Sequence, residues 1–316
     1  MPDLQTPLAD KPQSPSVAPQ PTLPTVDREF TVEEKSQWQQ ALRRFLRHRI
    51  AMVSLVLLFL LIVFAFVGPL FWQFRYDDVS GHDLSIAPGL KHPFGTDNLG
   101  TDELAVVMRG AQQSLKIAFS IAFLAVVVGS IWGVVSGYFL GITDSVLMRF
   151  ADLLLTIPGL ALAGALAHNT SGSWWVIALV LGGLSTPYVA RVVRGVVLSL
   201  REREFVEAAR ALGATNTRIM FRHLIPNTLA VVIVNATLLV AGGILAETAL
   251  SFLGLGVKTP DTSLGLLITT AQGAVDTRPW LFYFPGIVII LIALTVNFIG
   301  DGLRDALDPR QTRQRR

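Results

Sequence analysis

The residue types that most often carry out chemistry are few in this sequence and are scattered along it. The 316-residue chain has no cysteine and five histidines, and no two histidines stand at a spacing typical of metal ligands. The phosphate-binding pattern G-x-x-x-x-G-K-[ST] is also missing. We therefore expect no catalytic residue, no metal site and no directly bound cofactor. If the protein depends on ATP, partner subunits must use the ATP and Mg²⁺.

One charged segment, 199–227, has the features of a small protein-binding structure. Its sequence predicts a helix over 205–212 that Gly213 stops, followed by a second helix over 217–224 that Pro226 ends. Two short helices are more structure than a plain connector between long apolar segments needs. We expect the segment to fold as a helical hairpin.

The first helix of this hairpin carries Glu207 beside two small residues, Ala208 and Ala209, which we expect to be exposed. A compact helix with small exposed side chains can dock into a groove of another protein. The alternative is an amphipathic hairpin that lies on a membrane surface. The residues by themselves leave both interpretations open.

The apolar stretches contain few residues that could do more than pack. Glu247 is ionisable at membrane depth, which makes it a candidate for a pore or gate, although it could instead be the partner of a neighbouring polar group or stand at a water-exposed position. Pro158 is expected to kink its helix, and a kink near a pore could matter. Arg149 and Asp152 stand three residues apart on one helix and are expected to pair.

A four-residue repeat of glycines aligns along one face of a long apolar helix. Its members are Gly129, Gly133, Gly137 and Gly141. Because glycine has no side chain, a neighbouring helix can approach this face closely, and close packing drives helix association in lipid. We expect the repeat to serve helix packing.

The composition indicates a protein that crosses the membrane several times. Hydrophobic residues make up 51% of the chain, charged residues only 16%, and the mean hydropathy is +0.52. A soluble domain carries about 25% charged residues. The composition therefore argues against a water-soluble enzyme and a nucleic-acid-binding domain, and it makes membrane lipid the surroundings of the chain. Long uncharged runs include 50–74, 117–143, 153–190 and 279–300.

These runs predict an all-α membrane protein with six transmembrane helices. We place the spans at about 50–72, 115–140, 146–167, 174–198, 228–253 and 281–303. Lys and Arg are concentrated before the first span, between the fourth and fifth, and after the sixth. Because cytoplasmic segments carry an excess of these residues, we expect both termini and the hairpin to be cytoplasmic.

The same features divide the chain into four regions. They are a disordered Pro-rich cytoplasmic tail over 1–31; an N-terminal region over 32–111, with an amphipathic lead-in, the first transmembrane helix and an extracytoplasmic segment; a transmembrane domain over 112–308 that contains the segment 199–227; and a basic cytoplasmic tail over 309–316.

Four stretches together resemble one family of membrane proteins. Residues 207–226, with Glu-Ala-Ala, then Gly213, then Ile225-Pro226, resemble the EAA loop of integral-membrane subunits of binding-protein-dependent ABC importers. The general pattern has Ile where His223 stands and Leu at Ile225, but Arg222 to Asn227 resembles the peptide-importer branch. Residues 92–102, 247–256 and 300–309 resemble the same branch. Over about 40–310 the chain resembles the C-type permease of dipeptide, oligopeptide and nickel importers.

This resemblance implies the fold of a type I importer permease, in the bacterial cytoplasmic (inner) membrane, and a division of labour. An extracytoplasmic substrate-binding protein delivers di- or oligopeptides to a pore formed by this chain and a homologous B-type permease subunit. Two cytoplasmic ATPase subunits close on ATP, and the loop around Glu207 acts as the coupling helix. The residues implied in coupling are Glu207, Ala208, Ala209, Gly213, Arg222, His223 and Pro226.

The residues leave some alternatives for the substrate and the class of transporter. Relatives of this type also handle nickel, glutathione-like molecules or antimicrobial peptides. A self-sufficient secondary transporter is an alternative from a different class. It would need ionisable residues deep in several spans, and the centres of the first, second and sixth spans have none.

Overall fold

The computed structural model of the chain describes residues 37–169 and 172–307. The predicted tails, 1–31 and 309–316, therefore lie outside the described residues. Within the described ranges the structure is helical and has no strand, apart from an isolated β-bridge between Thr96 and Asp102. The expected all-α class is confirmed for this part of the chain.

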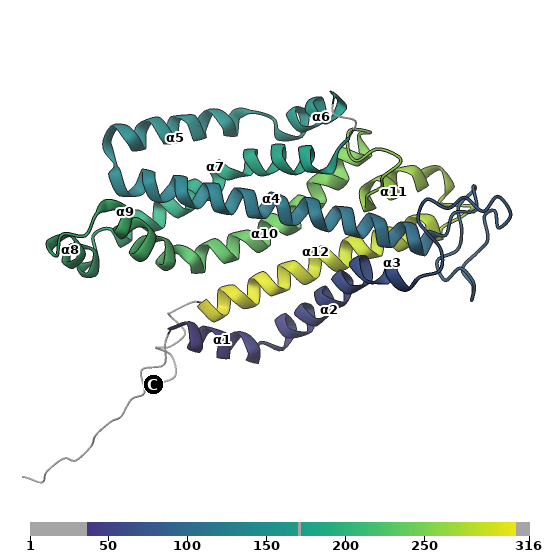
Figure 1. Cartoon of the computed structure of the whole chain (residues 1–316), viewed down its shortest axis with the longest axis horizontal. Coiled ribbons are helices and arrows are strands. Elements are labelled where there is room, and N and C mark those ends of the chain that lie inside the picture. Colours follow the sequence, from purple (N-terminus) through teal and green to yellow (C-terminus); the bar gives the residue numbers. More distant parts are fainter. Residues whose placement is uncertain (1–36, 170–171, 308–316) are drawn as a thin grey trace, which may run out of the picture. The chain divides into compact units, whose positions relative to one another are not determined.

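The helices surround a core of four long members. In chain order they are α1 (Gln37–Arg47), α2 (Arg49–Phe66), α3 (Gly68–Phe71), α4 (Glu103–Phe139), α5 (Gly141–Thr156), α6 (Gly159–Asn169), α7 (Trp174–Leu200), α8 (Glu204–Ala211), α9 (Asn216–Ile219), α10 (Ile225–Phe252), α11 (Leu264–Ala271) and α12 (Trp280–Leu307). In Figure 1, α4, α7, α10 and α12 run alongside one another and α2 lies along α12. Helices α8 and α9 lie at one end, here called the α8 end, and α11 lies near the other, the α11 end.

The number of helices that could cross a membrane agrees to within one with the six spans predicted from the sequence. Over the described residues, five helices are long and apolar enough to cross a membrane, and they include α2, α4, α7 and α12. The fifth runs continuously over Asn216–Phe252. A sixth span exists only if α5 and α6 count as one, and these two helices are bent by 76° at a break beside Pro158. The expected kink is therefore a full interruption of the helix.

Helix α4 is longer than the expected span of 115–140 because it continues into polar sequence. The Asp102 side chain accepts a hydrogen bond from the backbone N of Ala105 at 2.9 Å and so caps the helix at its start. The first turns carry Arg109 and Gln113, which a hydropathy pattern does not register as membrane helix. The expected domain division at 111–112 falls inside α4, and the described residues form one compact unit.

The expectation that Pro226 ends a helix is wrong. A π-helical turn, Met220–Leu224, joins α9 to α10, and Pro226 lies in the first turn of α10. The backbone N of Ile225 donates to the O of Met220, five residues earlier. Proline is tolerated in a first helical turn, where its missing N–H costs no hydrogen bond.

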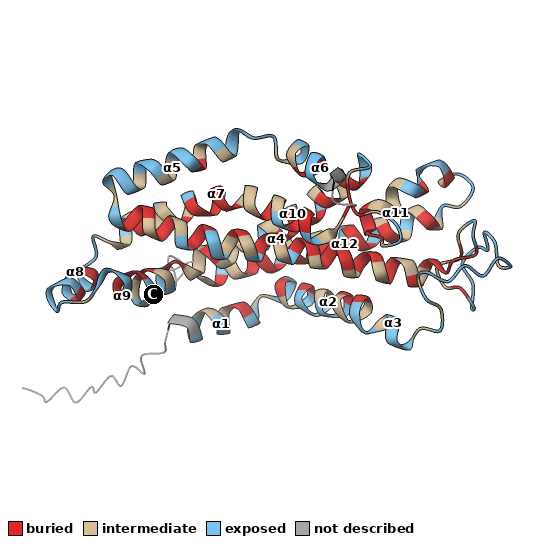
Figure 2. Ribbon diagram, turned by 45° about the horizontal axis from the view of Figure 1, so that its top comes forward, coloured by how far each residue is buried: buried red, intermediate tan, exposed pale blue. Residues whose placement is uncertain are grey.

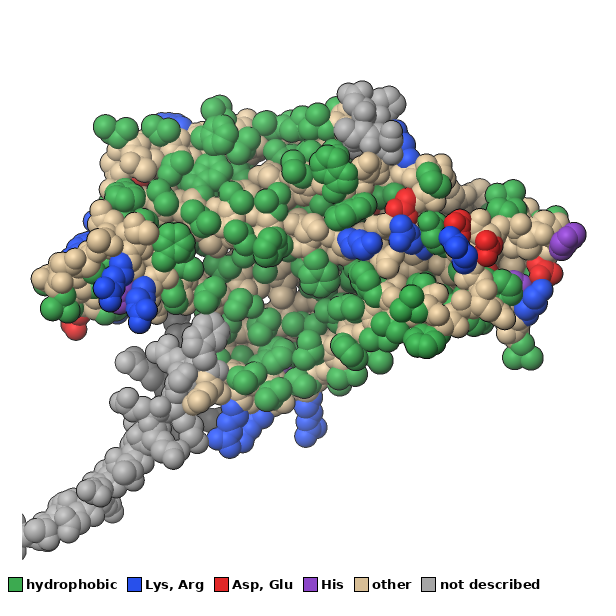
Figure 3. Space-filling model, viewed as in Figure 1, with side chains coloured by type: hydrophobic (Ala, Val, Ile, Leu, Met, Phe, Trp, Pro, Cys, Tyr) green, Lys and Arg blue, Asp and Glu red, His purple; other side chains and the backbone are tan. Residues whose placement is uncertain are grey.

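The largest apolar core forms between α2, α4, α10 and α12. Its fully buried members include Val107, Leu115, Ile244 and Ile292. Figure 2 shows burial concentrated on the inner faces of these long helices, whereas α5 and α8 are mostly exposed. On the face drawn in Figure 3, hydrophobic side chains cover the middle of the structure and many of the charged side chains lie toward its two ends, as expected of a membrane protein.

Candidate functional site

The predicted hairpin is present and is formed by residues 201–224, here called the coupling hairpin after the role that the resemblance implies. Helix α8 has acidic residues in its first turn and Arg210 in its last, an arrangement that suits the helix dipole. Gly213 follows with φ +77°, and its N donates to the O of Arg210 at 2.9 Å. The N of Ala214 donates to the O of Ala209 at 3.0 Å. These two bonds form a Schellman turn, so Gly213 stops the helix as the sequence predicts.

Most of the predicted coupling residues point outward. The exposed ones are Glu207, Ala208, Gly213, Arg222 and Pro226. His223 is half-buried, with its ring 6.3 Å from that of Phe205. The expectation that Ala209 is exposed is wrong, because Ala209 is 8% exposed and shares with Val206, three residues earlier, the face that packs on the rest of the hairpin.

The coupling hairpin also exposes large apolar side chains. Leu212, in the turn after α8, is 87% exposed, Phe221 is 55% exposed and Phe205 is 39% exposed. Exposed apolar side chains of this size are typical of surfaces that bind another protein or a membrane. The sequence analysis did not single out these residues, although Leu212 directly precedes Gly213.

The base of the coupling hairpin is fixed to the end of α4. The hydroxyl of Tyr138 donates to Oδ1 of Asn216 at 2.8 Å, and Nη1 of Arg201 donates to the backbone O of Tyr138 at 3.2 Å. The guanidinium of Arg210 lies 5.3 Å from the centre of the Tyr138 ring. All three contacts therefore join the hairpin to one residue of α4, Tyr138.

The glycine repeat of α4 faces α7 at three of its four positions. A Cβ at Gly129 would lie 2.7 Å from the Cβ of Val189, and one at Gly133 would lie 2.5 Å from the backbone O of Ala190. Gly137 is similarly close to Val197. Gly141 departs from the packing expectation. It has φ +60° and no atom within 4 Å of an added Cβ, so it makes the turn between α4 and α5.

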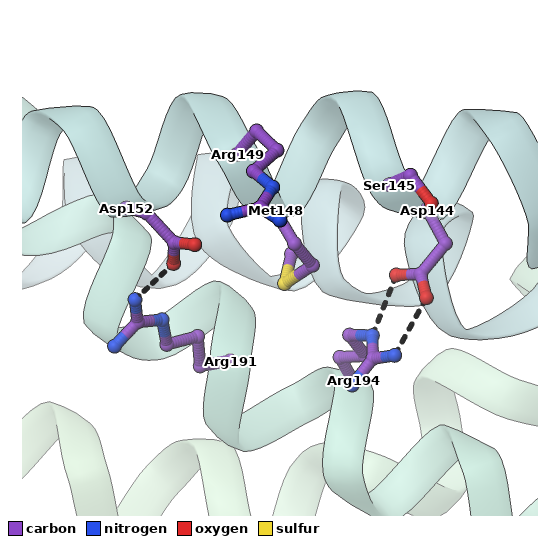
Figure 4. Close-up of a pocket in the computed structure, with 7 residues that line it drawn as sticks. All are labelled: Asp144, Ser145, Met148, Arg149, Asp152, Arg191 and Arg194. Atoms are coloured by element: carbon purple, nitrogen blue, oxygen red, sulfur yellow. Dashed lines mark hydrogen bonds and ion pairs between the residues drawn. The ribbon is translucent and has the colours of Figure 1, made fainter.

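A charged cleft of about 480 Å³ lies between α5 and α7. Figure 4 shows two ion pairs across it. Nε and Nη2 of Arg194 donate to the two carboxylate oxygens of Asp144, each at 2.6 Å, and Arg191 pairs with Asp152. The expected pairing of Arg149 with Asp152 is wrong, because Asp152 bonds across to α7. The Asp144 side chain also accepts a hydrogen bond from Ser136 of α4.

Sequence reasoning missed the role of Asp144, Arg191 and Arg194. A signal was present, because two arginines three residues apart interrupt the end of a long uncharged helix. Two carboxylates on the preceding apolar segment could have been assigned to them. The spacing within one helix, i to i+3, was the weaker guide, since the arginine partners of Asp144 and Asp152 both lie on the neighbouring helix α7.

Glu247 is fully buried and surrounded by hydroxyl groups. Ser251 donates to its Oε1 at 2.7 Å, and Ser114 of α4 donates to its Oε2 at 3.1 Å. The same Ser114 Oγ accepts the backbone N–H of Leu264 at 3.1 Å, at the start of α11. Glu247 thus partners neighbouring polar groups and ties α11 to α4 and α10.

The segment 72–102 is held by buried polar contacts around Asp102. Oδ1 of Asp102 accepts a hydrogen bond from the indole Nε1 of Trp72 at 2.9 Å, and Oδ2 lies 2.7 Å from Nδ1 of His92. Thr96 is fully buried and donates to the backbone O of Asp83 at 2.5 Å. We call this segment the outer clasp, because it fixes the start of α4.

Two of the following contacts attach the outer clasp to α12, and the third lies within the clasp. The ring of Phe94 stacks on Phe284 with 3.9 Å between ring centres, and the indole Nε1 of Trp280 donates to the O of Thr96 at 3.2 Å. Phe74, just after α3, stacks on His92. The described residues contain no group of His, Asp and Glu side chains that could hold a metal ion.

Comparisons with known proteins identify the family of the chain. Residues 125–313 match the family described as "Binding-protein-dependent transport system inner membrane component", and residues 36–93 match the "N-terminal TM domain of oligopeptide transport permease C". The "Oligopeptide transport system permease protein OppC" of Mycobacterium tuberculosis is 44% identical over 276 residues, 87% of this chain and 95% of that protein. The protein of the same name from Escherichia coli is 41% identical over 291 residues, 92% of this chain and 96% of its own length.

Two further similarities extend this result. The "Dipeptide transport system permease protein DppC" of Alkalihalophilus pseudofirmus is 35% identical over 94% of this chain and 97% of its own. A chain of the MetNI methionine ABC transporter, in an inward-facing crystal structure, superposes with a TM-score of 0.52 at 20% identity, over 64% of this chain and 96% of that one. The second similarity shows a shared fold. The chain belongs to the family of inner-membrane components of binding-protein-dependent transport systems.

Proposed function

We propose that this chain is a C-type permease subunit of an ATP-driven importer of di- and oligopeptides. It forms half of the pore with a homologous B-type permease, and an extracytoplasmic binding protein delivers the substrate. Two ATPase subunits use ATP and Mg²⁺ in the cytoplasm, and this chain binds neither directly. The relatives named for oligopeptides and for a dipeptide support the peptide substrate.

In this proposal the α8 end is cytoplasmic, and so are both termini. The Lys and Arg residues before α2, after α7 and after α12 support this orientation, since cytoplasmic segments are enriched in them. The outer clasp and α11 then face the binding protein. The break at Pro158 frees α5 to move at the pore, whereas Glu247 holds α11 in place.

The coupling hairpin is the proposed contact with an ATPase subunit. The observation that carries this assignment is the exposed apolar surface of Leu212 and Phe205 on a hairpin that Gly213 and Tyr138 hold in one conformation. A firmly held element can transmit a movement, provided that it contacts the partner differently in two states. Glu207 and Ala208 lie on the exposed side and are available for that contact.

The test uses the purified complex of this chain with its partners, in vesicles that contain the binding protein. We expect Glu207→Ala and Gly213→Val to keep the complex assembled but to lower ATP-driven peptide uptake by about tenfold, which corresponds to about 1.4 kcal/mol of lost coupling. Gly81→Val is the matched control, because Gly81 also has a positive φ, +67°, and open space for a Cβ, but lies in the outer clasp.

Normal peptide uptake in both hairpin variants would contradict the proposed role of the hairpin in coupling. Wild-type vesicles that take up nickel ions and no peptide would overturn the peptide substrate. Peptide uptake by the chain alone, without ATP or partners, would contradict the importer proposal and would favour a secondary transporter.

A further inference from the structure

The cleft between α5 and α7 places charged side chains at a depth where lipid would be expected. Helix α7 has 27 residues and is about 40 Å long, whereas the hydrocarbon core is about 30 Å thick. Arg191 precedes the last residue of α7 by nine positions, a rise of about 14 Å. If the ends of α7 protrude equally, Arg191 and its partner Asp152 lie inside the hydrocarbon core.

These charged groups require water beside them. The side chains of Arg191 and Asp152 are each 48% exposed, and Arg149 is exposed as well. Charged side chains within transmembrane segments face a water-filled cavity or the bundle interior, because their transfer into hydrocarbon is costly. The cleft therefore faces water in the assembled protein. Inside an importer, the water-filled space between the spans is the path of the substrate.

Arg149 differs from the other arginines of the cleft. Arg191 and Arg194 each have a carboxylate partner, whereas no carboxylate of the described residues lies within ion-pair distance of Arg149. Figure 4 shows Arg149 between the two ion pairs, on α5. Within each ion pair the positive and negative charges cancel, so Arg149 supplies the net positive charge of the cleft.

We propose that Arg149 binds the C-terminal carboxylate of the peptide during its passage through the cleft, which rests on the proposed import of peptides. A guanidinium matches a carboxylate with two parallel hydrogen bonds. The volume of about 480 Å³ falls within the range of small-ligand pockets. Every peptide with a free C-terminus carries this group whatever its side chains, so the contact suits a transporter that accepts many peptides.

The test measures binding of a radiolabelled dipeptide to the purified complex of both permeases and the ATPase subunits, without the binding protein. The same dipeptide is compared as free acid and as C-terminal amide. We expect the wild type to bind the acid about tenfold more tightly, and Arg149→Gln to bind both forms equally. Arg149→Lys should keep part of the preference. Arg75→Gln, which removes an arginine of the outer clasp, should keep all of it.

Three results would overturn the inference. One is a wild type that binds both forms equally or binds neither. Another is a preference that survives in Arg149→Gln. The third is a loss of co-purified acidic phospholipid in Arg149→Gln with unchanged peptide binding, which would assign the site to lipid. ATP-driven uptake by the wild-type complex, measured with the binding protein present, separates these results from a failure of the proposed function.

Discussion

The outer clasp and the coupling hairpin lie at opposite ends of α4 and are held in different ways. In the clasp, the polar side chains of His92, Thr96 and Asp102 are at most 3% exposed and bond to one another or to the backbone. In the hairpin, the buried side chains are apolar, and Tyr138 supplies the polar connection to α4. Both regions carry sequence that resembles the same family, but only the hairpin presents those residues to the outside.

The difference follows from the backbone. The clasp is irregular, so its N–H and C=O groups cannot all bond within a helix or a sheet, and buried side chains must complete them. Helices α8 and α9 bond their own backbones and need side chains only at their ends, as at Thr215, whose Oγ1 accepts from the N of Arg218. The motif residues of the clasp therefore maintain the fold, whereas Glu207, Ala208 and Gly213 of the hairpin stay exposed.

The largest effect should come from Asp102→Ala, which removes the centre of the clasp. The change deletes the cap of α4 and leaves the Trp72 indole and the His92 ring without their buried acceptor. We expect a loss of about 3 kcal/mol in stability, measured as a fall of several degrees in the apparent melting temperature of the purified chain in detergent. Asp102→Asn keeps an acceptor for the cap and should lose less.

Asp276→Ala is the matched control for this change, because Asp276 is an exposed carboxylate at the same end of the molecule. An Asp102→Ala chain as stable as this control would show that the clasp does not hold α4. The contrast with the hairpin would then lose its basis.

Much of this organisation could be predicted from the sequence, because it depends on local signals. Runs of apolar residues predict the spans, and Gly213 after a short helix predicts the turn. The same reasoning failed at Pro226, since a preceding π-helical turn lets the helix continue. It also failed at Ala209, because the side of α8 that faces inward is set by contacts with residues of α9 and the π-helical turn.

The contacts between distant segments could not be predicted. The carboxylate of Asp152 stands three residues from one arginine and 39 residues from another, and it pairs with the distant one, Arg191. Likewise, Ser114 and Glu247 are 133 residues apart. Such pairs depend on which helices become neighbours. That choice is set by the packing of the whole chain and not by any local stretch of sequence.

A smaller effect, confined to the hairpin, should come from Tyr138→Phe. The change removes the hydrogen bond to Asn216 but keeps the ring beneath Arg210. We expect a loss of about 1 kcal/mol, so backbone amides of α9 should exchange hydrogen about fivefold faster while those of the outer clasp stay unchanged. Tyr283→Phe, at an exposed position of α12, is the control. Faster exchange in both regions would show that they unfold together and are not held independently.

The smallest effect should be a pH dependence that belongs to the clasp alone. A hydrogen bond from Lys91 lowers the pKa of Asp83, burial partly opposes the shift, and His92 adds to it. Because the pKa in the folded chain lies below the unfolded value of about 3.9, this stabilisation is complete above that value and disappears as the pH falls through the folded pKa. Lys91→Gln should therefore lower the apparent melting temperature at neutral pH, and its difference from wild type should shrink below about pH 4. The Tyr138–Asn216 contact contains no carboxylate, so the difference between Tyr138→Phe and wild type should stay constant over the same range. A Lys91→Gln difference that persists in acid would mean that Lys91 supports the clasp by packing and not by its charge.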